Sequence, residues 1–112
     1  MNPANEVNLA GRVSAPAEQR QLPSGDLVVS FRLVVPRTRA AQRRTRQRVD
    51  TVECSVWTSR LRRTALSLSA GDDVAVSGEL RRTFRRGPVG VTSWVTLDVG
   101  DLRRAPTEAA AS

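Results

Sequence analysis

Residues 49–58 alternate between apolar and polar side chains with a period of two. In a β-strand this period sends successive side chains to opposite faces. One face would carry Val52, Cys54 and Val56 into a core, whereas the other would display Trp57 in a polar row. A displayed indole beside arginine-rich flanks indicates a surface on which something flat and anionic can stack. Periodicity alone leaves an equal alternative, in which Trp57 covers the end of a small barrel or a subunit contact.

Four further segments alternate in the same way. They predict strands at 7–13, 27–35, 74–80 and 91–99. Gly11 and Gly78 lie in line with the apolar residues of their segments, where a glycine commonly marks a bulge or the bend of a barrel strand. The fifth strand repeats the feature of the central one, because Trp94 falls on its polar face.

A single short helix is predicted between the third and fourth strands. Thr58 or Ser59 can cap its first turn and Gly71 suits its end, while the apolar residues between them share one helical face. Three strands, one short helix and two strands is the order of an OB-fold. The predicted class is therefore all-β, a five-stranded Greek-key barrel with the helix between strands 3 and 4.

Arginine dominates the charge of the chain. There are 18 arginines, no lysine and 11 acidic residues, which give a formal net charge of +7. Ten arginines crowd two segments, 37–48 and 81–90, which we expect to be a mobile loop of a long hairpin and a second hairpin loop carrying Phe84. Two basic clusters that can meet in space attract a phosphate backbone, so we favour a nucleic-acid partner. The alternative is that both are solvated loop tips.

The remaining composition narrows the possible functions. The length suits one domain with a modest core, which we assign to residues 1–104, followed by a short disordered tail at 105–112. No apolar run approaches membrane-spanning length, and the N-terminus shows no secretory signal. Because histidine is absent and cysteine occurs once, the usual metal-ligand sets and the commonest general base are missing. We expect a cytoplasmic, nucleoid-associated protein that binds no cofactor, metal or membrane and is not an enzyme.

A nuclease is the weakest alternative. Two neighbouring carboxylates can bind magnesium, and Asp72 with Asp73, or Asp98 with Asp101, could supply them. The first pair falls at a turn and the second at a strand end, where aspartates are ordinarily solvated.

Four collinear blocks between residues 5 and 103 resemble the bacterial single-stranded DNA-binding protein (SSB) family. Asn5–Arg12 carries an Asn-x-Val-x-Leu-x-Gly-Arg pattern, and Arg20–Gly25 is similar to the family's first turn. Glu53–Trp57 resembles its third strand, and Gly71–Arg81 carries a Gly-x-x-Val-x-Val-x-Gly-x-Leu pattern. The resemblance implies an OB-fold that binds single-stranded DNA without sequence preference in replication, recombination or repair. It also implies a homo-oligomer, with a tetramer favoured over a dimer.

The resemblance places Trp57 on a stacking position of the family, but other stacking positions differ. Arg39 and Thr51 stand where aromatics are typical, and the aromatic near the end of the fourth strand is Phe84. Trp94 has no family counterpart, so a subunit contact is as plausible for it as DNA stacking. Because arginine depends more on phosphate contact, we expect steeper salt sensitivity and less stacking than in a typical member.

The candidate DNA-binding residues combine both clusters with the exposed aromatics and two strand arginines. They are Arg12, Arg32, Arg37, Arg39, Arg43, Arg44, Arg46, Arg48, Trp57, Arg81, Arg82, Phe84, Arg85, Arg86 and Trp94. Four apolar residues indicate a subunit contact: Val28 and Val34, expected to face outward, and Val7 and Leu9 near the first edge. The last eight residues lack the acidic tip with which SSB proteins recruit repair enzymes. We therefore expect no such recruitment, in a short paralogue or a shortened chain.

Two other functions stay open from the sequence. One is an OB domain that binds RNA or works in a primosome, because no residue here recognisably reads a 2′-hydroxyl. The other is a protein-interaction domain whose arginines meet an acidic partner and whose tryptophans lie in that interface.

Overall fold

The computed structural model describes residues 2–104, along which six strands and two short helices follow one another. They are β1 (Val7–Val13), β2 (Glu18–Gln21), β3 (Leu27–Pro36), α1 (Arg39–Arg44), β4 (Val49–Val56), α2 (Ser59–Leu66), β5 (Asp73–Gly87) and β6 (Gly90–Arg104). The five predicted strands are β1, β3, β4, β5 and β6, and the predicted helix is α2. The tail predicted at 105–112 lies outside the described residues.

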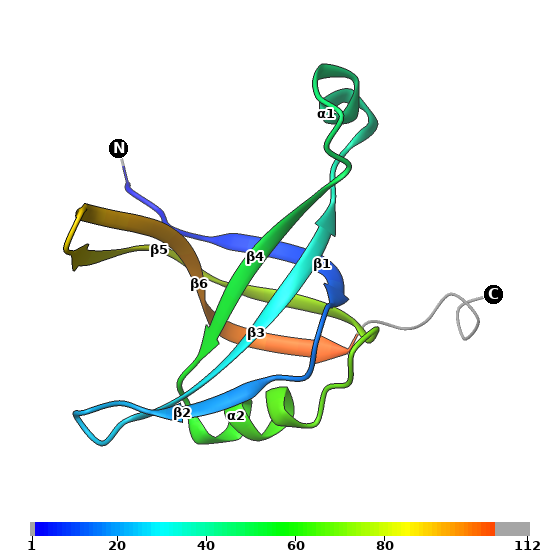
Figure 1. Ribbon diagram of the computed structural model, residues 1–112. Helices are drawn as coiled ribbons and strands as arrows, with labels where there is room; N and C mark the ends of the chain where they lie inside the picture. The colour runs from blue at the N-terminus through cyan, green and yellow to red at the C-terminus, as the bar shows by residue number, and fades with distance from the viewer. Residues whose placement is uncertain (1, 105–112) are drawn as a thin grey trace.

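The strands form one sheet that curls into a barrel. Their order is β1-β5-β6-β4-β3-β2, and the barrel closes where β1 also pairs with β3, with Arg12 opposite Val34. All pairings are antiparallel except that of β4 with β6. In Figure 1, β3 and β4 cross β5 and β6, and α2 lies under one end of the barrel. This confirms the predicted OB-fold.

The core lies at the inward positions of the alternating strands. Seven of its side chains are almost fully buried: Val13, Val29, Leu33, Cys54, Val56, Val74 and Leu97. Leu61 and Ala65 of α2 join the same cluster, as the helical spacing predicts. Burial also raises the pKa of the Cys54 thiol to about 12, so this cysteine stays protonated and acts as a small apolar side chain.

The four residues expected to form an apolar subunit contact do not form one exposed apolar patch. Val28 was expected to face outward but is 2% exposed. Val7 and Leu9 pack partly buried against the core, because closure of the barrel draws β1 over it. Val34 is half-buried. Exposed apolar side chains gather instead on the far part of β5 and β6.

Two glycines mark the places where strands approach most closely. A Cβ on Gly11 would meet the carbonyl oxygen of Val34, and one on Gly78 would meet that of Asp98. The β5–β6 register also shifts between Ser77 and Gly78. Both positions were predicted as bends, and the close approach explains why no side chain fits there.

Near the second bend, Asn5 fastens the N-terminal segment to β5. Its side-chain nitrogen donates to the carbonyl oxygen of Leu80 at 2.9 Å, and its side-chain oxygen accepts from the Leu80 N–H at 2.8 Å. The carboxamide therefore replaces a backbone peptide in the ladder, which gives the asparagine of the first sequence block a structural role.

The structure corrects two local predictions and adds one strand. Residues 37–48 contain α1, which begins after Thr38, whose hydroxyl accepts from the Ala41 N–H at 3.2 Å. Residues 81–90 are not a loop, because β5 runs to Gly87 and β6 begins at Gly90, which has φ of 126°. The polar stretch after β1 forms the edge strand β2.

None of the helices in the described region is long and apolar enough to cross a membrane.

Candidate nucleic-acid interface

The outer surface of four adjacent strands displays polar residues in rows. Because cross-strand partners share a face, Arg32 of β3, Glu53 of β4, Thr96 of β6 and Arg81 of β5 form one row across the sheet. Within this row Thr96 is buried, at 6% exposed. In β4 the alternation that buries Cys54 and Val56 leaves Glu53 and Ser55 on this surface. Trp57 follows directly after β4, and continuing the observed pleat by one residue places its indole on the same polar face, as predicted.

Trp57 is held at both its backbone and its ring. Arg62 of α2 donates to the carbonyl oxygens of Trp57 and Leu27, at 3.0 and 3.1 Å. The indole Nε1 donates to Oδ1 of Asp98 at 3.2 Å. The guanidinium of Arg81 lies over the ring, 5.8 Å from its centroid, within the range of a cation–π interaction. Trp57 is therefore a fixed and partly covered platform.

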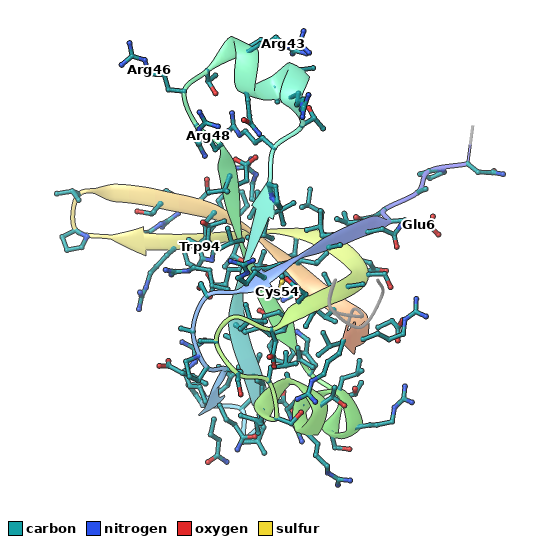
Figure 2. All side chains as sticks on the ribbon, turned by 90° about the vertical axis from the view of Figure 1, so that its right-hand side faces the viewer. Glu6, Arg43, Arg46, Arg48, Cys54 and Trp94 are labelled. Carbon is teal, nitrogen blue, oxygen red and sulfur yellow. The ribbon has the colours of Figure 1, made fainter. Side chains whose placement is uncertain are left out.

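Trp94 lies on the same side of the sheet in a more open setting. Its cross-strand partner is Thr83, which alternation places with Arg81. The indole is 36% exposed and lines a shallow hollow with Arg32, Thr51, Glu53 and Val95. Figure 2 shows it where β5 and β6 leave the barrel. The structure thus brings both tryptophans to one outer surface, as the two polar faces predict.

The segment 37–48, here called the α1 hairpin, projects from the barrel at the ends of β3 and β4 (Figure 1). Its predicted arginines differ in role. Arg37 donates to both carboxylate oxygens of Asp50 at 2.9 Å and to Thr45 Oγ1 at 3.0 Å. These hydrogen bonds raise the pKa of Arg37 and lower that of Asp50. Arg37 thus anchors the base of the α1 hairpin and is not a freely available phosphate ligand.

The other arginines of the α1 hairpin surround an open hollow. Its lining residues are Arg39, Gln42, Arg43, Arg44, Thr45, Arg46 and Arg48, and its volume is about 740 Å³. In Figure 2, Arg43 and Arg46 point away from the barrel while Arg48 lies nearer to it. A hollow lined by five arginines and no acid attracts phosphate groups.

The second basic cluster lies on the β5–β6 arm, defined here as residues 81–95, where these strands extend beyond the barrel. Alternation divides its predicted residues between two faces. Arg81 and Arg85 share a face with Trp94, whereas Arg82, Phe84 and Arg86 lie on the opposite face. The second face is also apolar, with Phe84 64% exposed. The cluster is therefore not the single basic patch that its sequence suggests.

The two predicted arginines outside the clusters occupy different places. Arg32 lies exposed on the outer surface, beside Glu53 in the register. Arg12 lies at the closure of the barrel, 3.9 Å from Asp73. The register places it opposite Val34 of β3, on a strand that neighbours both β3 and β5.

The aspartates considered for a nuclease each contact arginine. Asp72 lies 4.0 Å from Arg104, and Asp101 lies 3.4 Å from Arg103. Within residues 2–104, no group of three or more acidic, histidine or cysteine side chains gathers in a way that could hold a metal ion.

Asp98 and Arg62 contact Trp57, and the sequence reasoning did not single out either residue for this position. Both act on Trp57 from other elements, one from β6 and one from α2. The polar alternation of β6 placed Asp98 on the outer surface with Trp94, but its contact with Trp57 depends on the β4–β6 register. No local pattern reveals that register.

Comparison with known proteins agrees with the fold and the motifs. The model of the single-strand binding protein family matches residues 4–96. A single-stranded DNA-binding protein of Oceanobacillus iheyensis is 30% identical over 97 residues, which are 87% of this chain and 60% of that protein. One of Bacillus cereus is 32% identical over 92 residues, 82% of this chain and 54% of that protein. The chain thus spans little more than half the length of these relatives.

A solved structure shares the fold. It is a Plasmodium falciparum SSB in complex with ssDNA, and it matches with a TM-score of 0.79 at 19% identity, over 94% of this chain and 97% of that one. The fold coincides over most of both chains. The chain belongs to the single-strand binding protein family.

Proposed function

We propose that this protein binds and protects single-stranded DNA without sequence preference, in replication, recombination or repair. The observation that carries the proposal is the pairing of Trp57 and Trp94 on one outer surface, between two arginine-rich projections. Family membership and the names of the relatives support it. A duplex hides its base faces, so paired aromatic platforms favour a single strand.

In this mechanism the two kinds of side chain divide the work. Bases stack on the indoles, a contribution of about 1–3 kcal/mol per base. Phosphates pass along the five arginines that line the α1 hairpin hollow and along Arg82, Arg85 and Arg86 of the β5–β6 arm, where they displace condensed counterions. Neither contact reads the hydrogen-bonding edge of a base, which accounts for the absence of sequence preference.

The proposal extends to the oligomeric state and the cellular location of the protein. A homo-oligomer, with a tetramer favoured, would let one strand pass over several copies of this surface. The role is binding and not catalysis, since the aspartates considered for a metal site contact arginines. Chromosomal single-stranded DNA as the partner would place the protein in the cytoplasm, at the nucleoid.

A tryptophan-fluorescence titration tests the proposal. Wild-type protein and Trp57→Ala are titrated with oligo-dT, a duplex and an RNA of equal length, each at low and high salt. We expect quenching by oligo-dT that partly survives high salt, and a loss of affinity in Trp57→Ala of about 1–3 kcal/mol. Light scattering on the same samples measures the oligomeric state.

Three results would contradict the proposal. Equal and fully salt-sensitive binding of all three polymers would mean that the arginines attract any polyanion. Preference for the RNA would favour the RNA-binding alternative. Absence of binding at low salt would leave an acidic protein partner as the explanation of the basic surface.

A further inference from the structure

Asp98 joins the two parts of the proposed stacking site. One carboxylate oxygen accepts from the indole of Trp57 at 3.2 Å, and the other lies 2.7 Å from Nη2 of Arg81. The side chain is 19% exposed, whereas that of Arg81 is 54% exposed. A largely buried carboxylate thus connects an aromatic platform to a more exposed cation.

The contact depends on three strands. Asp98 lies on β6, opposite Ser55 of β4 on one side and Glu79 of β5 on the other. The register brings the end of β4, with Trp57, and the start of the β5–β6 arm, with Arg81, to the same carboxylate. Because Asp98 offers one carboxylate oxygen to Trp57 and the other to Arg81, it sets both the direction of the indole N–H and the position of the guanidinium.

We propose that Asp98 is a positioning residue for base stacking, which orients the Trp57 indole and holds Arg81 against one of its faces. A base then stacks on the opposite face, so that the indole lies between a guanidinium and a base. This inference rests on the proposed single-stranded DNA binding. It adds that Arg81 serves the platform and is not one of the phosphate ligands.

The charges explain why an acid can occupy this surface. An unpaired carboxylate repels a phosphate backbone, but Arg81 neutralises Asp98 at short range. Loss of the carboxylate would release Arg81, which could then bind a phosphate. The two contacts can therefore be tested separately with Asp98→Asn. Asparagine keeps an oxygen that accepts from the indole but lacks the negative charge that holds Arg81.

The first experiment needs no nucleic acid. In a Trp94→Phe background, in which Trp57 is the single fluorophore of its type, Asp98→Ala and Asp98→Asn are compared by tryptophan anisotropy. We expect Asp98→Ala to lower the anisotropy because the indole gains local motion, and Asp98→Asn to keep it. Arg81→Ala should keep the anisotropy and raise quenching by acrylamide, because one face of the ring is uncovered.

The second experiment measures binding of oligo-dT to the same variants across a salt series. Asp98→Ala should lose about tenfold in affinity, the lower part of the range for a lost stacking contact. Asp98→Asn should steepen the dependence of log K on log salt by about 0.7, the value for one more phosphate contact to a single strand. Glu53→Gln is the matched control, because it removes a negative charge from the same surface without touching Trp57 or Arg81.

The results discriminate clearly. Unchanged anisotropy and affinity in Asp98→Ala would overturn the positioning role, and so would a salt dependence that changes equally in Asp98→Asn and Glu53→Gln. If the wild-type protein binds no oligo-dT, the proposed function fails, but the anisotropy measurement still decides whether Asp98 orients the indole. Asp98→Asn preserves the shape of the side chain and so guards against misfolding of the alanine variant.

Discussion

The α1 hairpin and the β5–β6 arm have similar arginine-rich sequences but present their charges differently. In the α1 hairpin, a short helix and its flanks gather five arginines around one hollow, above the bidentate Arg37–Asp50 pair. In the β5–β6 arm, a continuous ladder sends neighbouring arginines to opposite faces and mixes them with Phe84 and Trp94. Charge count alone therefore does not define an interface; the periodicity of the backbone decides which charges act together.

The largest expected difference between these regions is in salt dependence. Replacing the five arginines of the hollow, Arg39, Arg43, Arg44, Arg46 and Arg48, by glutamine should make the dependence of log K on log salt less steep. The change should reach up to about 3.5 units, since each phosphate contact on a single strand contributes about 0.7. Affinities for oligo-dT and for a duplex should both fall. An unchanged slope would show that the α1 hairpin does not contact the nucleic acid.

The β5–β6 arm should show the opposite behaviour. Phe84→Ala removes an exposed aromatic ring, so we expect a loss of about 1–3 kcal/mol in binding to oligo-dT if a base stacks there. Its salt slope should stay unchanged. Val91→Ala is the control, because Val91 lies on the same face without an aromatic ring. Equal losses in both variants would assign this face to an apolar contact between subunits.

The turn of the β5–β6 arm should be sensitive to a single methyl group. Gly90 has φ of 126°, a conformation that L-residues rarely adopt, so Gly90→Ala should introduce a strain of roughly 1–2 kcal/mol. Amide hydrogen exchange should accelerate near Gly87 and leave the α1 hairpin unaffected. Faster exchange throughout the barrel would show that the arm folds as one unit with the core.

The smallest effect should appear in the α1 hairpin at acid pH. The hydrogen bonds from Arg37 lower the pKa of Asp50 in the folded protein. The stabilisation is therefore fully present above the unfolded pKa, about 3.9, and is lost as the pH falls through the lowered folded value. NMR shifts of Thr45 and Gln42 should report this loss, and Asp50→Asn should remove the pH dependence. The β5–β6 arm should not respond through this pair.

The sequence predicted the barrel well because its core depends on local alternation. Cys54 and Val56 face inward as the period of two requires, and Gly11 and Gly78 mark close strand approaches. Residues 81–90 of the β5–β6 arm were predicted as a hairpin loop, because their dense arginines hid a regular alternation that pairs Phe84 with Ser93. Only part of the proposed stacking surface could be predicted. Alternation placed Trp57 on the polar face, but its contact with Asp98 depends on a long-range register that no local pattern reveals.

The hydrogen bonds of Asn5 have a consequence for solubility. Among the described residues, β1 pairs with β5 only as far as Gly78, and Asn5 replaces the next strand residue at Leu80. Beyond that point β5 has an open edge, which could template aggregation by pairing with the same edge of another copy. This edge carries Arg81, Arg82, Arg85 and Arg86. Repulsion between two such edges opposes pairing, so the arginines of this edge also keep DNA-free protein from aggregating.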